Sequence, residues 1–168
     1  MNILYCGDKP MQKGILLSSM SLIGNVEEPL NIYILTVDYS EKGVNYNPVD
    51  KAFAKYLERK LNKSDIGVNV FLVDVTRYFV EELPEANMQS RFTACCMLRL
   101  FADKTDIKER VLYLDTDVLC RKDFSDFYYQ NMDGIEIAGV SDYYGRWLFG
   151  DGYINSGVML MNMKAIRE

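Results

Sequence analysis

An almost unbroken apolar run at residues 30–37, LNIYILTV, most constrains the fold. Its branched and aromatic residues are typical of a strand that is buried on both faces. Such strands occur mainly in parallel sheets that are covered by helices. Shorter apolar runs of strand length occur at residues 2–6, 68–73, 111–114, 135–140 and 153–163.

Helical patterns separate these runs, at residues 11–23, 76–83 and 89–101. Asn47-Pro48 predicts another helix start, because a capping side chain precedes a proline at the first helical position. The helix that follows would bury one face, made of Val49, Phe53, Tyr56, Leu57 and Leu61. This alternation predicts an α/β fold with a mostly parallel central sheet and helices on both faces.

The bulk composition limits the classes of function. A length of 168 residues predicts a single domain, and the net charge of −5 argues against nucleic acid as a partner. We expect no transmembrane segment and no signal peptide, which favours a cytoplasmic protein. Residues 163–168 resemble the first turns of a helix without a cap, so we expect a domain over residues 1–168 that is truncated at its C-terminus.

The chain contains no histidine, which excludes Ser-His and Cys-His catalysis and histidine-based zinc sites within these residues. Acid-base or metal chemistry must then rest on carboxylates, Lys, Tyr, Arg or backbone groups. The cysteines show no metal-ligand spacing. We expect all four to be small buried apolar residues: Cys6, Cys95, Cys96 and Cys120.

Asp115 and Asp117 directly follow the predicted strand at residues 111–114. Ligands of open α/β sheets bind at the carboxyl ends of strands. Two carboxylates separated by one residue can face one hard cation of the Mg²⁺ or Mn²⁺ kind, whose shell is completed by phosphate oxygens and water. The pair therefore predicts a metal site for a phosphorylated substrate.

Two other interpretations of the pair stay open. The carboxylates can simply cap the turn after the strand. The stretch at residues 112–119, LYLDTDVL, also resembles the first motif of haloacid-dehalogenase-like phosphatases, in which the first Asp is the nucleophile and the second is the general acid. That motif usually opens its domain, whereas several predicted strands precede it here and few residues follow it.

Three further segments accompany this pair: ILYCGD at residues 3–8, Leu98-Arg99-Leu100, and YINSGVML at residues 153–160. Together with RVLYLDTDVL at residues 110–119, this order resembles glycosyltransferase family eight. That family includes bacterial lipopolysaccharide galactosyl- and glucosyltransferases and glycogenin. The resemblance spans essentially the whole chain and implies a GT-A fold, a Rossmann-like nucleotide-binding sheet. It also implies a retaining transferase that uses a UDP-sugar and Mn²⁺.

The resemblance implies roles at the nucleotide end of the site. Cys6 and Asp8 would lie at the uracil, and Asp115 and Asp117 would hold the Mn²⁺ (or Mg²⁺) ion. Thr116 would lie beside the ribose. An alternative for Asp8 is a turn residue beside a glycine.

At the sugar end, Arg99 matches the family arginine that faces the donor, where a guanidinium can bond a phosphate or a hydroxyl. Asn155, Ser156 and Gly157 would line the donor-sugar pocket, and Asp142 would face the sugars. The alternatives are an ion pair for Arg99, a bend in a strand for the Asn-Ser-Gly segment, and a turn for Asp142.

Two departures from the family pattern matter. Pro10-Met11 stands where relatives often have an aromatic residue near the uracil, although a methionine can cover a ring face less rigidly. The family's third metal ligand, a histidine in a later His-x-x-Gly-x-x-Lys motif, is absent, and so is a later acidic pair near the acceptor. The ion would then have two protein ligands, which would weaken donor binding.

The predicted function is transfer of glucose or galactose from UDP to a hydroxyl of a saccharide or glycolipid acceptor with retention, as in lipopolysaccharide biosynthesis. A nucleotide-sugar-binding module without turnover is the alternative, ahead of the phosphatase. An exposed apolar face would promote self-association, so a homo-oligomer stays an open alternative.

Overall fold

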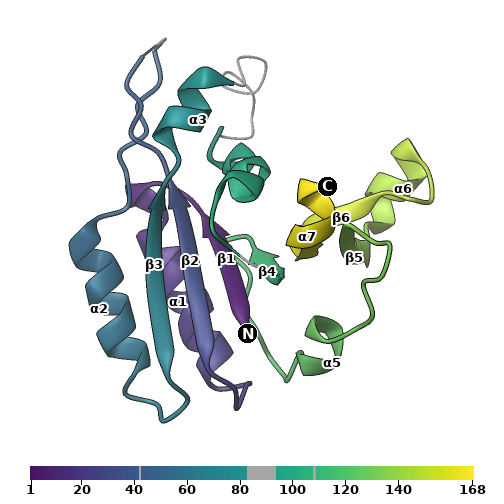
Figure 1. Ribbon diagram of the computed structural model, residues 1–168, viewed down its shortest axis with the longest axis horizontal. Coiled ribbons are helices and arrows are strands. Elements are labelled where there is room, and N and C mark those ends of the chain that lie inside the picture. Colours follow the sequence, from purple (N-terminus) through teal and green to yellow (C-terminus); the bar gives the residue numbers. More distant parts are fainter. Residues whose placement is uncertain (42, 83–93, 108) are drawn as a thin grey trace.

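The computed structural model describes residues 1–41, 43–82, 94–107 and 109–168. These described residues form one six-stranded sheet in the order β3-β2-β1-β4-β6-β5 (Figure 1). Its strands are β1 (Asn2–Cys6), β2 (Leu30–Thr36), β3 (Val68–Asp74), β4 (Arg110–Leu114), β5 (Ile137–Ser141) and β6 (Ile154–Asn162). Its helices are η1 (Lys9–Met11), α1 (Gln12–Ile23), α2 (Lys51–Leu61), α3 (Thr76–Glu81), η2 (Ala94–Lys104), α5 (Ser125–Tyr128), α6 (Tyr143–Phe149) and α7 (Met163–Arg167).

The sheet is mostly parallel. β1 pairs in parallel with β2 and β4, and β2 pairs in parallel with β3. β6 lies antiparallel between β4 and β5. The predicted α/β fold is confirmed, although the direction of β6 was not foreseen.

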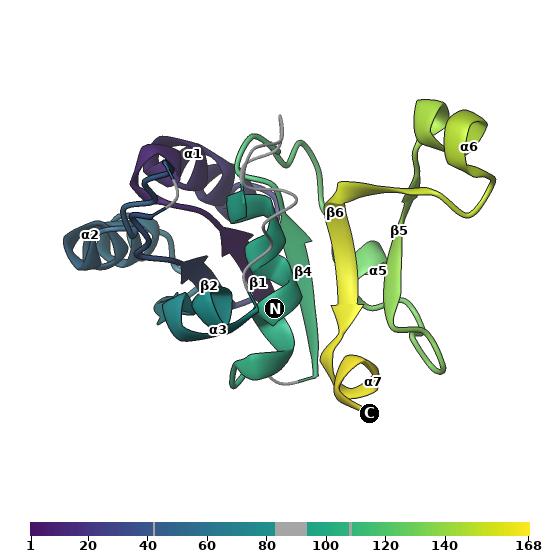
Figure 2. The same cartoon turned by 90° about the horizontal axis from the view of Figure 1, so that it is seen from above.

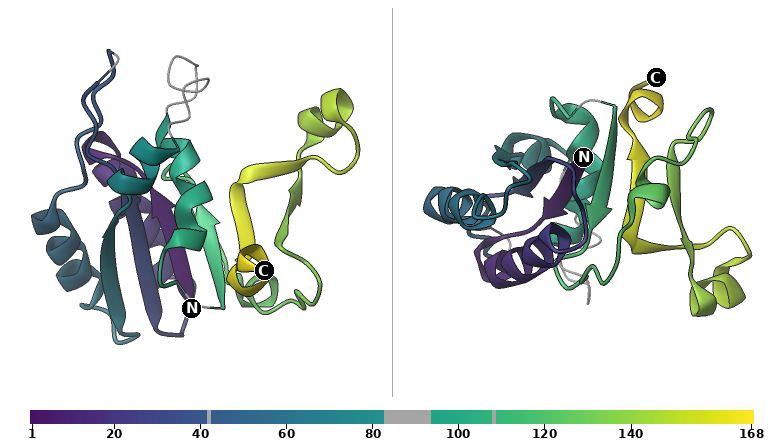
Figure 3. Two further views of the ribbon diagram at one scale, coloured as in Figure 1. Left: turned by 45° about the horizontal axis from the view of Figure 1, so that its top comes forward. Right: turned by 90° about the horizontal axis from the view of Figure 1, so that it is seen from below.

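Each face of the sheet carries its own apolar core, because successive side chains of a strand point to opposite faces. Ile3 and Tyr5 of β1 belong to a core with α1, α2 and α5, whereas Leu4 and Cys6 belong to one with α3, η2 and α7. Figure 3 shows η2 and α7 on the side of the sheet opposite α1. Helices therefore cover both faces, as the apolar runs predict.

The helix predicted to begin at Asn47-Pro48 begins instead at Lys51. The Lys9 amide donates to the Asn47 carbonyl at 2.8 Å, and the Val49 amide donates to the Thr36 hydroxyl at 2.9 Å. These bonds hold the segment against β2 and η1 in place of a first helical turn. The predicted buried face was also wrong at Tyr56, which is 45% exposed.

The helix predicted at residues 89–101 lies partly outside the described residues. Its described part, η2, is a 3-10 helix rather than an α-helix. The expectation that all four cysteines are buried was wrong for Cys96 and Cys120, which are only half-buried. No described helix has the length and the apolar character needed to cross a bilayer.

Candidate functional site

The carboxyl ends of β1 and β4 meet at one edge of the sheet, because the two strands are parallel neighbours. The chain proceeds from β1 to β2 and β3 on one side and then returns to β4 on the other. Such a switch in strand order is where ligands bind in open α/β sheets. Because β6 is antiparallel to β4, its first residues also lie at this edge, and Leu114 pairs with Val158.

Asp115 is fixed at this edge by its own backbone and by Tyr113. Its amide donates to the Gly157 carbonyl at 2.8 Å, and its Oδ1 accepts a hydrogen bond from the Tyr113 hydroxyl at 2.5 Å. The Asp115 carbonyl accepts from the Val118 amide at 3.1 Å. The backbone therefore also forms a turn after the strand, as in the alternative interpretation of the aspartate pair. Asp115 and Thr116 are half-buried, and Asp117 is exposed.

The missing side chain of Gly157 keeps the second oxygen of Asp115 accessible. A Cβ at position 157 would lie 2.9 Å from Asp115 Oδ2 and 3.1 Å from Asn155 Oδ1. The space is therefore kept open beside a carboxylate oxygen, which suits a hard cation that completes its shell with phosphate and water. Among the described residues, no group of three or more acidic or cysteine side chains gathers around a common point, so such an ion would rely on its substrate for further ligands.

Arg99 projects from η2 onto the strand that carries the aspartates. Its Nε donates to the Cys96 carbonyl at 2.6 Å, and an Nη donates to the Ser156 carbonyl at 2.5 Å. Its guanidinium carbon lies 4.6 Å from the centre of the Tyr113 ring, a cation–π distance. One aromatic side chain thus contacts both Arg99 and Asp115.

Asp8, at the end of β1, is a buried carboxylate with an unpaired oxygen. The residue is 8% exposed, and its Oδ1 has no hydrogen-bond partner among the described residues. Burial raises the pKa of this carboxyl. Although Asp8 precedes η1, its side chain makes no capping bond there, so the simple turn interpretation does not account for this oxygen.

Cys6 and Met11 flank this turn. Burial raises the pKa of the Cys6 thiol, although Arg99 nearby lowers it. A Cβ on Gly7 would lie 2.8 Å from the Met11 sulfur, so the methionine packs directly over the glycine. The thiol is therefore neutral at ordinary pH and can take part in recognition only through its backbone or its shape.

Asp142 caps α6, which is the structural alternative to a role at the sugars. Its Oδ1 accepts from the Gly145 amide at 2.5 Å. The Asn155 amide group lies 3.4 Å from its Oδ2, and Asn155 Oδ1 accepts from the Gly157 amide at 2.9 Å. Asp142 therefore lies next to the Asn-Ser-Gly segment while also supporting a helix.

Two residues at this edge escaped the sequence prediction. Tyr113 reads as a core residue, although a buried tyrosine usually finds a partner for its hydroxyl. Gly14 lies inside α1, where a glycine usually has a packing reason. A Cβ there would lie 2.6 Å from the Thr116 carbonyl oxygen, so α1 packs directly on the backbone between the two aspartates.

The sequence profile of the family described as Glycosyl transferase family 8 matches residues 2–168. The chain belongs to glycosyltransferase family 8. The resemblance inferred from the motifs is therefore confirmed, and the family match argues against the phosphatase interpretation of Asp115.

Two curated relatives come from streptococci. A probable glycosyl transferase Gly of Streptococcus gordonii is 28% identical over 112 residues, which cover 67% of this chain and 15% of the relative. Glycosyltransferase GlyA of Streptococcus pneumoniae serotype 4 is 24% identical over 162 residues, which cover 96% of this chain and 22% of the relative. The chain thus spans about a fifth or less of the length of these relatives.

Solved structures share the fold. An active-site mutant of LgtC superimposes with a TM-score of 0.79 at 20% identity, over 99% of this chain and 59% of that one. The galactosyltransferase LgtC in complex with donor and acceptor sugar analogues gives 0.77 at 21% identity, with the same coverage. GlyE of Streptococcus pneumoniae gives 0.69 at 21% identity, over 99% and 34%. The chain therefore has the GT-A fold of these proteins.

Proposed function

We propose that this chain forms the donor-binding part of a retaining hexosyltransferase that uses UDP-glucose or UDP-galactose and a divalent cation, Mn²⁺ or Mg²⁺. The observation that carries the proposal is the convergence of Asp115, Arg99 and Gly157 at the switch point between β1 and β4. Membership of family 8 supports it, as does the neighbour LgtC, which was solved with donor and acceptor sugar analogues.

The buried end of the site suits the base of the nucleotide. The unpaired Asp8 oxygen can accept a hydrogen bond from an N–H of uracil, and the backbone of Cys6 lies beside it. Met11 packs over the turn and can cover a ring face. Thr116 would then lie beside the ribose.

The open end suits the diphosphate and the sugar. Asp115 and Asp117 would hold the cation, which when bound stabilises negative charge on the departing diphosphate. Arg99 adds a fixed positive charge whose orientation depends on Tyr113 and Ser156. Asn155, Ser156 and Asp142 would contact the sugar, and the acceptor would be a saccharide or glycolipid, as in lipopolysaccharide biosynthesis in the cytoplasm.

A binding module without turnover is the second candidate. It is favoured by one observation: in the described part of the chain, no third carboxylate or cysteine side chain gathers with Asp115 and Asp117. Such a site can bind a nucleotide sugar and still fail to activate it.

The test is a calorimetric titration of the 168-residue chain with UDP-glucose and UDP-galactose, with and without Mn²⁺, and with GDP-mannose as the control nucleotide sugar. We expect metal-dependent binding of a UDP-sugar that Asp115→Asn abolishes and that Asp65→Asn, at an exposed turn far along the chain, leaves intact. Slow release of free hexose would support the transferase, and binding without release would support the module. Absence of binding with either UDP-sugar would contradict both.

A further inference from the structure

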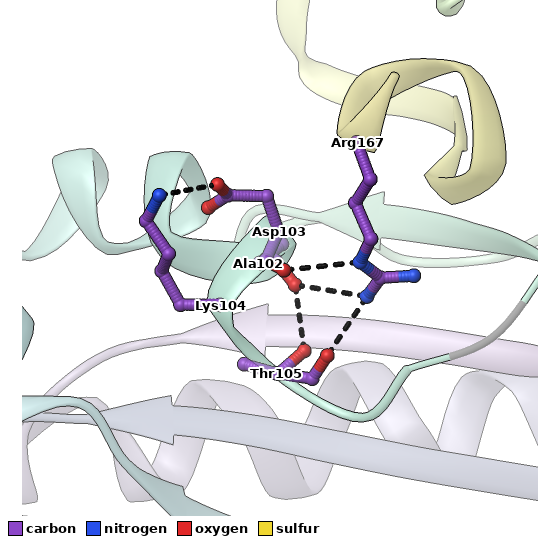
Figure 4. Close-up of polar contacts among 5 residues, drawn as sticks. All are labelled: Ala102, Asp103, Lys104, Thr105 and Arg167. Carbon is purple, nitrogen blue, oxygen red and sulfur yellow. Dashed lines mark hydrogen bonds and ion pairs between the residues drawn. The ribbon is translucent and has the colours of Figure 1, made fainter.

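Arg167 of α7 closes the end of η2, the helix that carries Arg99. Its Nε donates to the Asp103 carbonyl at 3.0 Å, and one Nη donates to the Thr105 carbonyl at 2.8 Å (Figure 4). The same Nη also donates to the Ile107 carbonyl at 2.6 Å. The Ala102 carbonyl lies 3.5 Å from the same nitrogen. One guanidinium therefore donates hydrogen bonds to several backbone carbonyls.

The Ala102 carbonyl already accepts from the Thr105 amide at 3.2 Å and the Thr105 hydroxyl at 2.6 Å, so Arg167 acts mainly on the carbonyls of Asp103, Thr105 and Ile107. The last carbonyls of a helix find no N–H donor within that helix. A cation at a helix C-terminus also interacts favourably with the helix dipole. The fork of an arginine can reach several acceptors at once, which a lysine ammonium does less well. The Asp103 carboxylate pairs with Lys104 at 2.9 Å rather than with Arg167, so Arg167 acts on the backbone.

η2 is a 3-10 helix of 11 residues, whereas 3-10 runs of more than three or four residues are uncommon. We therefore expect hydrogen bonds from outside the helix to support η2. Another link to the same part of the chain is Arg99 itself, which donates to Ser156 near the start of β6. Hydrogen bonds therefore join η2 both to β6 and to the helix that directly follows it.

We propose that Arg167 is a positioning residue for Arg99. Asp103, whose carbonyl accepts from Arg167 at 3.0 Å, lies in η2 four residues after Arg99, so the bond of Arg167 holds the turn of η2 next to the one that carries Arg99. Release of that end would let η2 shift and would change the stacking of Arg99 on Tyr113. The consequence for ligand affinity rests on the proposed function, whereas the consequence for Arg99 itself does not.

The first experiment measures the Arg99 side chain without any ligand. The Nε–H resonance of Arg99 is assigned in a ¹H–¹⁵N spectrum by its loss in Arg99→Lys. We expect Arg167→Ala to shift or broaden this resonance and Arg59→Ala to leave it unchanged. Arg59 is the matched control, because it is an exposed arginine of α2 that donates to one carbonyl in its own helix. An unchanged resonance in a folded Arg167→Ala protein would overturn the proposal.

The second experiment is a double-mutant cycle on the dissociation constant for UDP with Mn²⁺. We expect Arg167→Ala to weaken binding about three- to tenfold in the natural background and less than about twofold in Arg99→Ala. Equal losses in both backgrounds would show that Arg167 acts without Arg99 and would overturn the proposal. If Arg167→Ala does not fold, Arg167→Lys takes its place in both experiments with the same criteria. Failure of the unaltered chain to bind UDP would contradict the proposed function and leave the resonance test decisive.

Discussion

The Asp8 carboxylate, for which we propose a role in binding the base, is expected to cost stability. Its oxygen is buried without a partner, and burial raises its pKa above the ordinary 3.8. We expect Asp8→Asn to raise the free energy of unfolding by about 1 kcal/mol at neutral pH, because it removes an uncompensated buried charge. It should also weaken UDP binding, and Asp65→Asn should do neither.

The pH dependence of this gain in the free energy of unfolding follows from the raised pKa of Asp8 in the folded chain. Above the raised pKa, Asp8 is charged in both the folded and the unfolded chain, so the advantage of asparagine is complete. It should decline as the pH falls from that raised pKa to 3.8 and vanish below, where the carboxyl is protonated in both states. Urea unfolding at a series of pH values measures it, and a gain that grows toward acid pH would contradict the assignment.

Tyr113 links the arginine and the aspartate of the candidate site. Tyr113→Phe keeps the ring below Arg99 and removes only the hydroxyl that donates to Asp115. We expect about a tenfold loss of Mn²⁺ affinity in the presence of UDP, a typical effect of losing a bond that orients a metal ligand. Manganese paramagnetic resonance can measure this.

The control for this change is Tyr128→Phe. The Tyr128 hydroxyl is also partly buried, but it accepts from the Asn2 amide at 2.8 Å at the opposite end of β1. Tyr128→Phe should lower the free energy of unfolding and leave the affinity for Mn²⁺ unchanged. Equal affinity losses in both variants would show that the hydroxyl of Tyr113 has no specific role.

Most candidate residues could be named from the sequence, because the strand pattern places Asp115 at a strand end and the resemblance to family eight implies roles for Asp8 and Gly157. Tyr113 could not, because its neighbours in sequence are apolar and its role depends on Arg99, which comes from another element. Arg167 was missed for the same reason. Its acceptors are backbone carbonyls, which leave no trace in the sequence.

At the scale of elements, α1 and the turn after β4 are in direct contact through Gly14. Alanine normally stabilises a helix interior by about 1 kcal/mol relative to glycine. Here the new Cβ would lie 2.6 Å from the Thr116 carbonyl oxygen, and such overpacking costs about 1–3 kcal/mol. We expect Gly14→Ala to destabilise the chain in thermal unfolding and to weaken UDP binding.

Gly24 gives the matched control, because it follows the same helix and a Cβ there meets nothing within 4 Å. Gly24→Ala should change the free energy of unfolding by less than about 0.5 kcal/mol. A Gly14→Ala protein as stable as the unaltered chain would show that the turn yields easily and does not depend on α1.

The strands were predicted closely and the helices less so. Apolar runs mark strands because both faces of the sheet are covered, whereas the start of α2 depends on Thr36 and Lys9, which lie far away in sequence. The C-terminal end of η2 is likewise bonded by Arg167, which lies more than sixty residues later in the sequence. Local patterns contain no information about such partners.

At the scale of the whole molecule, α6 stands away from the body of the fold (Figure 2). Trp147 is 84% exposed and Leu148 is 64% exposed, and other apolar residues of this helix are similarly open. Contiguous exposed apolar side chains promote association. We expect the 168-residue chain to self-associate, with a sedimentation coefficient that rises with concentration.

Trp147→Ser combined with Leu148→Ser should abolish that concentration dependence without changing UDP binding. Leu17→Ser is the control, because Leu17 is 61% exposed on α1, away from this helix. Since Trp147 is the sole tryptophan of the sequence, its emission reports on the same surface. A monomer at all concentrations would contradict the expectation.

The antiparallel course of β6 has a consequence for the newly made protein. Asp115, directly after β4, lies beside Gly157, which is synthesised some forty residues later, so the proposed sugar end of the site is incomplete while only the parallel strands have emerged from the ribosome. A nucleotide can stabilise only a form that it binds. Under the proposed function, a nucleotide sugar would therefore make its full set of contacts, and stabilise the chain fully, only after β6 has docked beside β4.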